Sequence, residues 1–184
     1  MEVKLGAGEK LILLLLCDIC DHLKIKGESH TELIKEAIFS GNLWGLDWGL
    51  PGVFHDYETP TEVVKESVDV LSMWTRLEES FEHLSDQDKS WLEKQAEPFG
   101  KQVRFPGFDG NNESTYISAA RFMIDHLDRF QRFKGREMNA HMPTIGFHRR
   151  MLAVFDPILK RVLNKDFSAA EISQVLNAQR HPES

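Results

Sequence analysis

The chain has 184 residues, 41% of them hydrophobic and 28% charged, which excludes a disordered protein and suits one domain with a sizeable core. Its formal net charge of −7 argues against a nucleic-acid partner or an anionic membrane surface, because both are bound through an excess of Lys and Arg. The two cysteines imply no disulfide framework, so we expect a cytoplasmic protein.

The first elements of the chain are predicted to be helices. A helix is expected over residues 9–23, and its apolar run Leu11–Leu16 is too short for a bilayer, which needs about 20 residues. We therefore expect this run to be buried and not to be a targeting segment. Ser29 or Thr31 caps a second helix that Gly41 stops, and one or two helical turns are expected around Trp44 to Leu50.

Residues 17–22 of the first helix collect side chains that can bind metals. Cys17 and Cys20 form a CxxC pair, with Asp18, Asp21 and His22 among and after them. A zinc site needs four ligands, and the sequence offers no second half for this one. We interpret the cluster as part of a helix surface and expect neither a metal nor a cofactor.

The middle of the chain carries the clearest helix start. Thr59, Pro60 and Glu62 fit the N-cap, the first helical position and the third position of a capping box. Apolar residues then recur at helical spacing as far as Phe81. Ser85 caps a further helix that ends before Pro98.

The segment Val103–Phe133 begins as a loop rich in glycine and aromatic residues and continues as a helix. Asn112 is predicted to cap this helix, which runs to Phe133 and whose wide apolar stripe favours a central position in the fold. Its polar residues predict ion pairs one turn apart, namely Arg121–Asp125, Asp125–Arg129 and Asp128–Arg132.

The C-terminal part adds at least two more helices. Pro157 should kink or break the first of them near Asp156. Ser168 and Glu171 make a capping box for the last one. The whole pattern predicts an all-α fold, a single-domain irregular bundle of about seven helices over residues 1–184, with frayed ends at 1–8 and 179–184. Only residues 102–105 hint at a strand.

The sequence contains no phosphate-binding loop, dinucleotide fingerprint or metalloprotease motif. Two R-x4-H pairs, Arg121 with His126 and Arg136 with His141, have the spacing of helical ribonucleases of the HEPN type, but chance alone accounts for about one such match. A ligand-binding or enzymatic site built on Arg104, Asp109 and Arg121, which the glycine-rich loop would bring together, is a separate alternative. We name no catalytic residue.

Several short motifs together resemble the YfbU family of uncharacterised bacterial proteins. They are LIL at 11–13, GFD at 107–109, RFM at 121–123, NAxxP at 139–143, RML at 150–152 and SAxEI at 168–172. The segments 44–54 and 157–168 depart from the pattern. The resemblance implies an all-helical fold, a cytoplasmic location and oligomeric members, and it supplies no reaction.

These observations lead to one main functional hypothesis. We expect a self-associating, non-enzymatic interaction protein, a homo-oligomer that can also take an unidentified protein partner, with no membrane attachment. The second hypothesis is the ligand-binding protein or enzyme at Arg104, Asp109 and Arg121, and the third is the ribonuclease.

Overall fold

The computed structural model describes residues 3–25, 30–50, 52–53, 58–162 and 165–180. These residues form eight α-helices and two short 3-10 helices, which confirms the all-α prediction, and within these ranges no strand forms. A single bridge between Phe108 and Asn139 is the only sheet-like pairing of the described residues. The chain separates into two compact units, Met1–Glu58 and Thr59–Ser184, which we describe one at a time. The organisation of residues 1–184 as one domain stays a prediction.

The first unit consists of three helices, α1 (Ala7–His22), α2 (Thr31–Ser40) and α3 (Trp44–Gly49). Helix α1 packs on α2, and α2 packs on α3. As predicted, Gly41 ends α2, where its φ of 76° is a left-handed conformation that costs glycine little. Residue 29, one of the two predicted caps of α2, lies outside the described residues.

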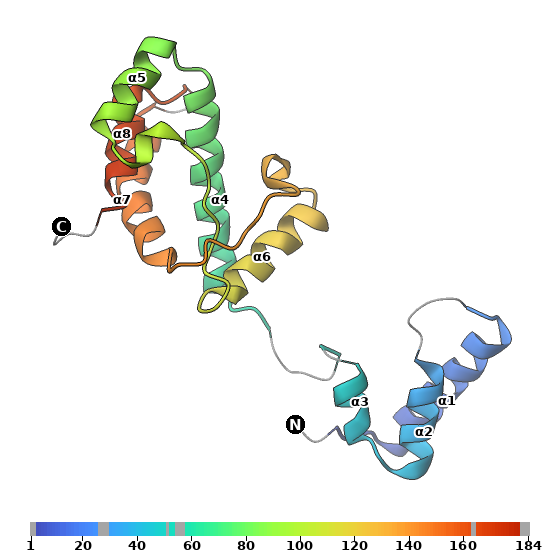
Figure 1. Cartoon of the computed structure of the whole chain (residues 1–184). Coiled ribbons are helices and arrows are strands. Elements are labelled where there is room, and N and C mark those ends of the chain that lie inside the picture. Colours follow the sequence, from blue (N-terminus) through green and yellow to red (C-terminus); the bar gives the residue numbers. More distant parts are fainter. Residues whose placement is uncertain (1–2, 26–29, 51, 54–57, 163–164, 181–184) are drawn as a thin grey trace. The chain divides into compact units, whose positions relative to one another are not determined.

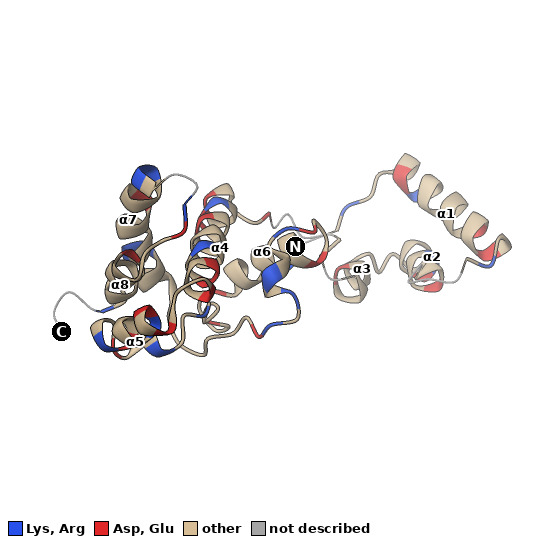
Figure 2. Cartoon of the chain, turned by 90° about the horizontal axis from the view of Figure 1, so that it is seen from above, with Lys and Arg blue, Asp and Glu red and all other residues tan. Residues whose placement is uncertain are grey.

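The burial predicted for Leu11–Leu16 is wrong. Cys17 is the only buried residue of α1, whereas Leu11 and Ile12 are each 59% exposed. The run is apolar around more than half of the helix, and α2 covers only one side, so the other side has no neighbour among the described residues of its own unit. Figure 2 shows the charged residues of α1 toward its two ends and none along its middle.

The second unit is built around α4 (Thr61–Glu82), which packs against α6 (Ser114–Asp125), α7 (Ile145–Val162) and α8 (Ala169–Asn177). Figure 1 shows α4 between α6 on one side and α7 and α8 on the other. Helix α5 (Asp86–Gln95) and the 3-10 helix η1 (Phe99–Lys101) pack together against α8. The core of this unit contains Leu71, Trp74 and Leu77 of α4, all buried, with side chains from every one of these α-helices.

Two of the four predicted side-chain caps of this unit are confirmed, and the cap predicted at Asn112 is wrong by one residue, because Glu113 occupies the N-cap of α6. The hydroxyl of Ser85 accepts from the backbone N–H of Asp88, and Ser168 forms a full capping box with Glu171. The cap predicted at Thr59 is wrong by one residue. Pro60 occupies the N-cap of α4 and, being proline, makes no side-chain cap, so the amides of Val63 and Val64 bond to its carbonyl.

The helix predicted from Asn112 to Phe133 is shorter than expected. It ends at Asp125, after which Asp128 and Phe130 adopt left-handed φ values of 52° and 53° before the 3-10 helix η2 (Gln131–Phe133). This turn lets Phe133 enter the core, where it is fully buried. The expectation of a central helix is also wrong, because α4 takes that position and Phe122 of α6 is 56% exposed.

None of the three ion pairs predicted along this segment is present among the described residues. The left-handed turn removes the helical spacing that Asp125–Arg129 and Asp128–Arg132 required. Arg132 instead makes a bidentate pair with Glu82 of α4, with N–O distances of 2.7 and 3.0 Å.

A kink or a break was predicted near Pro157, and the break does not occur, because α7 continues through the proline from Ile145 to Val162. A proline inside a helix removes one backbone hydrogen bond. Phe155 and Ile158 flank the proline and are buried, and this burial offsets the loss. Among the described helices, none is both long enough and apolar enough to cross a membrane.

Candidate functional site

The loop that follows η1 runs through the interior of the second unit. Phe105 and Phe108 are buried, and their rings lie 5.4 Å apart in an edge-to-face contact. The amide of Phe108 donates to Met138 O, and the amide of Ala140 donates to Phe108 O, at 2.9 and 2.8 Å. These two backbone hydrogen bonds pair the loop with residues 138–140 in the manner of a short β-bridge.

Gly107 makes this close approach possible. Its φ is +95°, and a Cβ placed on it would lie 2.3 Å from Met138 O, which is closer than any real contact. Only glycine fits both the backbone conformation and the space. The glycine of the GFD motif at 107–109 is therefore a structural requirement of this loop.

The buried carboxylate of Glu113 links the loop to the start of α7. Its Oε1 accepts from the amides of Thr144 and Ile145, and its Oε2 accepts from the amide of Asp109, each at 2.8 Å. The hydroxyl of Thr144 donates to Oε2 at 2.7 Å. Burial alone would raise the pKa of Glu113, but these hydrogen bonds outweigh it and hold that pKa below its usual value.

The sequence did not predict the contacts that Glu113 makes outside its own helix. The cap predicted at Asn112 would put Glu113 in the first turn of the helix, where a carboxylate interacts favourably with the helix dipole. It stands at the N-cap of α6, and its side chain also satisfies amides at the start of α7, whose first residue is Ile145. A contact across 32 residues leaves no local pattern in the sequence.

His148 of α7 is buried between the loop and α4. The indole Nε1 of Trp74 donates to its Nδ1 at 3.2 Å, so Nδ1 carries no proton and Nε2–H donates to Gly107 O, also at 3.2 Å. Desolvation lowers the pKa of His148 to about 4, although Gly107 O and the carboxylates of Glu113 and Glu66 favour the protonated form. This histidine is neutral at physiological pH and acts as a packing and hydrogen-bonding group.

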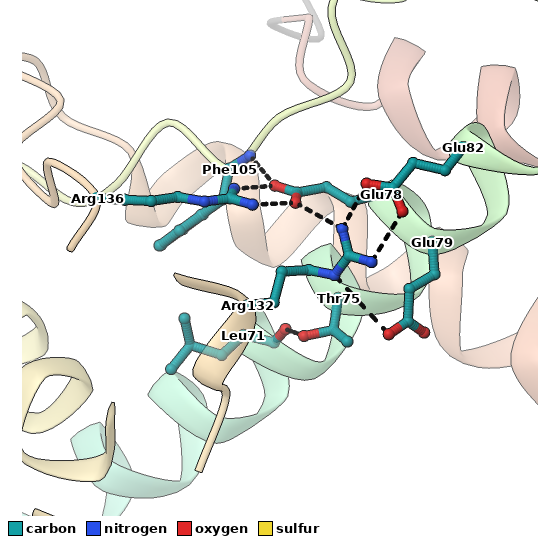
Figure 3. Close-up of polar contacts among 8 residues, drawn as sticks. All are labelled: Leu71, Thr75, Glu78, Glu79, Glu82, Phe105, Arg132 and Arg136. Carbon is teal, nitrogen blue, oxygen red and sulfur yellow. Dashed lines mark hydrogen bonds and ion pairs between the residues drawn. The ribbon is translucent and has the colours of Figure 1, made fainter. Parts of the chain in front are cut away.

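Glu78 of α4 is the second buried carboxylate, and Figure 3 shows it between two arginines. Arg136 binds it through two N–O contacts of 2.8 and 2.9 Å, and Arg132 approaches it at 3.5 Å. The amide of Phe105 donates to Glu78 Oε1 at 2.8 Å, the oxygen that also accepts from Nη1 of Arg136. This network ties the loop and the segment after η2 to α4.

The three candidate ligand residues lie at different places in this unit. Asp109 is 2% exposed, and hydrogen bonds from the Asn111 amide and the Asn112 side chain lower its pKa. Arg104 and Arg121 are exposed and line separate cavities. Among the described residues, no hydrogen bond or ion pair joins any two of the three, so the structure does not gather them into one site.

The residues of the two R-x4-H pairs are placed differently from each other. Arg121 and His126 line the same depression, of about 400 Å³, on the surface of α6. Arg136 is engaged by Glu78, while His141 is exposed and has a left-handed φ of 56°. Arg121 and Arg136 share the wall of a small cavity of about 260 Å³.

Cys17 and Cys20 are free thiols, and burial raises the pKa of Cys17. The neighbouring Asp18 and Asp21 both bind Lys35 of α2, at 2.8 and 2.6 Å. These two carboxylates join α1 to α2, which supports the interpretation of the 17–22 cluster as part of a helix surface.

A cavity of about 610 Å³ contains Arg104 and was not expected from the sequence. It lies beside η1 and the start of the loop, and its wall includes Trp74, Phe99, Lys101, Gln102 and Gln179. No sequence motif indicates it, because its residues come from three separate stretches of the chain, at 74, 98–106 and 179.

The described residues thus define an all-α protein whose buried ionic groups fasten its helices and loops together. The family model for the YfbU domain matches residues 3–178, which cover both units. The chain belongs to the YfbU family, as the short motifs predicted.

Proposed function

We propose that this protein is a non-enzymatic interaction protein that forms a homodimer through the exposed side of α1. The observation that carries the proposal is a set of large aliphatic side chains on this helix that are 51–63% exposed: Leu11, Ile12, Leu15, Leu16, Ile19 and Leu23. Such a contiguous apolar surface is rare on monomeric proteins and marks an interface.

The small core of the first unit supports a partner for this surface. Within its described residues, only Cys17, Ala37 and Leu46 are buried apolar side chains. A unit of this size cannot offset its conformational entropy with so little burial. Covering the α1 surface would supply the missing apolar burial, at about 25 cal/mol per Å².

A second copy of α1 in antiparallel orientation fits this surface. A two-fold axis between Leu15 and Leu16 sets Ile12 level with Ile19 of the second copy. The same axis sets Glu9 level with His22 of the second copy at each end of the apolar run, so an acidic residue does not face its own copy there. A parallel pair would place like charges side by side, which favours the antiparallel dimer.

Exposed aromatic side chains extend the apolar surface of this unit. Phe39 of α2 is 74% exposed, and Trp48 of α3 is 80% exposed and stacks edge-to-face on Trp44 at 5.5 Å. Aromatic residues are enriched in interfaces because they bury a large area with few rotatable bonds. Their exposure leaves further apolar area on this unit for an interface, which in a standard complex buries ~800 Å² on each partner.

The proposal is tested by the mass of the particle in solution. Light scattering after size exclusion should give twice the chain mass for the native protein and one chain mass for the double substitution Ile12→Glu and Ile19→Glu. Leu127→Glu is the matched control, because Leu127 is 52% exposed and lies in the second unit. A native protein that stays monomeric at every concentration would exclude the dimer.

The orientation is tested by cross-linking in a chain without Cys17 and Cys20. Leu15→Cys should form an intermolecular disulfide, since residue 15 lies beside the axis. Leu23→Cys should not, because the two copies of residue 23 would be about 22 Å apart along antiparallel helices. Disulfides from both Leu15→Cys and Leu23→Cys would indicate a parallel pair, which sets every residue beside its own copy, and would contradict the proposal.

The alternatives have less support from the geometry. A ligand site of Arg104, Asp109 and Arg121 requires these side chains to lie together, but the two arginines line separate cavities. In one of the two R-x4-H pairs, the arginine, Arg136, is bound to Glu78. The net charge of −7 also argues against an RNA substrate. We keep a cytoplasmic location and an additional protein partner as parts of the proposal, motivated by the two free thiols and by the exposed aromatic residues of α2 and α3.

A further inference from the structure

We infer that the 610 Å³ cavity beside η1 binds a small organic anion, with its acidic group at Lys101 and Arg104 and its planar apolar part against Phe99 and the small edge of Trp74 that reaches the cavity wall. This binding site is separate from the proposed dimer, because all of its residues belong to the second unit. Its volume lies within the roughly 300–1,000 Å³ typical of small-molecule sites.

The charge of the cavity selects an anion. Lys101 and Arg104 are both exposed, and neither makes a hydrogen bond or ion pair with another described residue. The described lining contains no Asp or Glu. Two unpaired cations at one cavity of a chain with net charge −7 contrast with Arg132, Arg136 and Arg149, which bind carboxylates of α4.

Hydrogen bonds beside the cavity hold the segments that carry its walls in place. On the α8 side, Arg150 donates to the carbonyls of Ala178 and Gln179. Asn177 donates to Gln95 O, and Arg180 donates to Glu97 O, which joins the end of α8 to the segment before η1. A site fixed in this way loses little entropy when a ligand enters.

Two features fix the apolar part of the site. The indole of Trp74 is oriented by its hydrogen bond to His148, so its ring plane cannot rotate freely. Gly100 brings η1 against α5, since a Cβ there would lie 2.3 Å from Leu92 O. The neighbouring Phe99 and Lys101 are thereby held at the cavity wall. Flat aromatic anions match this combination of an aromatic surface and two cations.

The test uses three probes that share one ring and differ in charge: phenyl phosphate, benzoate and neutral benzamide. Binding is followed by NMR through the indole N–H signal of Trp74, which Trp74→Phe identifies by its disappearance. Phenyl phosphate and benzoate should shift this signal saturably, with millimolar dissociation constants of the order expected for fragments. The better of the two anions tells whether the site takes a phosphate or a carboxylate.

The variants separate a built site from general surface charge. Arg104→Gln and Lys101→Gln should each weaken the better anion at least fivefold while the indole signal of Trp74 persists. Lys94→Gln is the matched control, because Lys94 is exposed nearby and lines only the neighbouring cavity. Equal weakening by Lys94→Gln, equal binding of benzamide, or no saturable shift at tens of millimolar anion would each overturn the inference.

Discussion

The indole of Trp74 in α4 donates a hydrogen bond to Nδ1 of His148 in α7, two residues 74 positions apart that meet in the core. This contact fixes the neutral tautomer of the histidine and leaves its Nε2–H for the loop carbonyl of Gly107. His148 is fully buried, so both of its ring nitrogens depend on protein partners.

The first prediction concerns pH. The pKa of His148 is about 4 in the folded protein against 6.5 for an unperturbed histidine, so below pH 6.5 only the unfolded state takes up the proton. Stability should therefore fall as the pH drops from 6.5 and level off near 4, by roughly 2 kcal/mol between pH 7 and 5. Urea unfolding at pH 7, 6 and 5 measures this loss.

The control is His148→Gln, which keeps an acceptor for Trp74 but does not titrate. Its stability should be lower at pH 7 and should change little between pH 7 and 5. The carboxylates with lowered pKa, such as Glu66 and Glu113, lose their contribution to stability only below about pH 4.5. They therefore do not account for a change in stability between pH 7 and 5. An unchanged pH slope in the variant would show that His148 is not the responsible group.

The second prediction concerns Glu113. Glu113→Gln should reduce the free energy of unfolding by about 2–4 kcal/mol, because an amide nitrogen then faces buried N–H donors that need an acceptor. Glu93→Gln, at an exposed position, should change it by less than about 0.5 kcal/mol. Thermal and urea unfolding measure both, and equal effects would contradict the role assigned to the Glu113 carboxylate.

The third prediction concerns the pair of Glu78 and Arg136. Arg136→Met should cost about 3–5 kcal/mol because it leaves much of a buried charge unpaired. Adding Glu78→Gln removes that charge, so the double variant should be more stable than the sum of the single losses by at least about 1 kcal/mol. A double-mutant cycle measures this coupling, and additive losses would mean that the two side chains do not depend on each other.

The fourth prediction compares two glycines with positive φ. Gly107→Ala should cost at least about 3 kcal/mol, since it adds a clash with Met138 O to the strain of a left-handed alanine. Gly135→Ala has open space around the new methyl group and should cost about 1 kcal/mol. Similar losses for the two variants would show that the close approach at Gly107 is not required.

Local patterns predicted much of the helical fold. Ser85, Ser168 with Glu171, and Gly41 were assigned correctly, because a cap or a stop depends on residues a few positions away. The break that Pro157 allowed does not occur, because burial of its neighbours, a tertiary effect, offsets the local penalty. The end of α6 was missed because the apolar residues up to Phe133 keep a helical spacing while serving a turn and a 3-10 helix.

The candidate sites were the least predictable part. Arg104, Asp109 and Arg121 are close in sequence, and yet Asp109 turned inward and the two arginines reached different cavities. The wall of the cavity at Arg104 includes Trp74 and Gln179, which are 105 positions apart in the sequence. Only tertiary packing brings such residues together, and a single sequence contains no signal for it.

The Glu113 carboxylate also has a consequence for how the second unit opens. The amides of Asp109, Thr144 and Ile145 all end on this one side chain, although they belong to segments more than 30 residues apart. None of them can be released to solvent while the other two stay in place without leaving part of the carboxylate unsatisfied. In hydrogen exchange these three protons should therefore behave as one cooperative unit, exchanging with a common opening free energy.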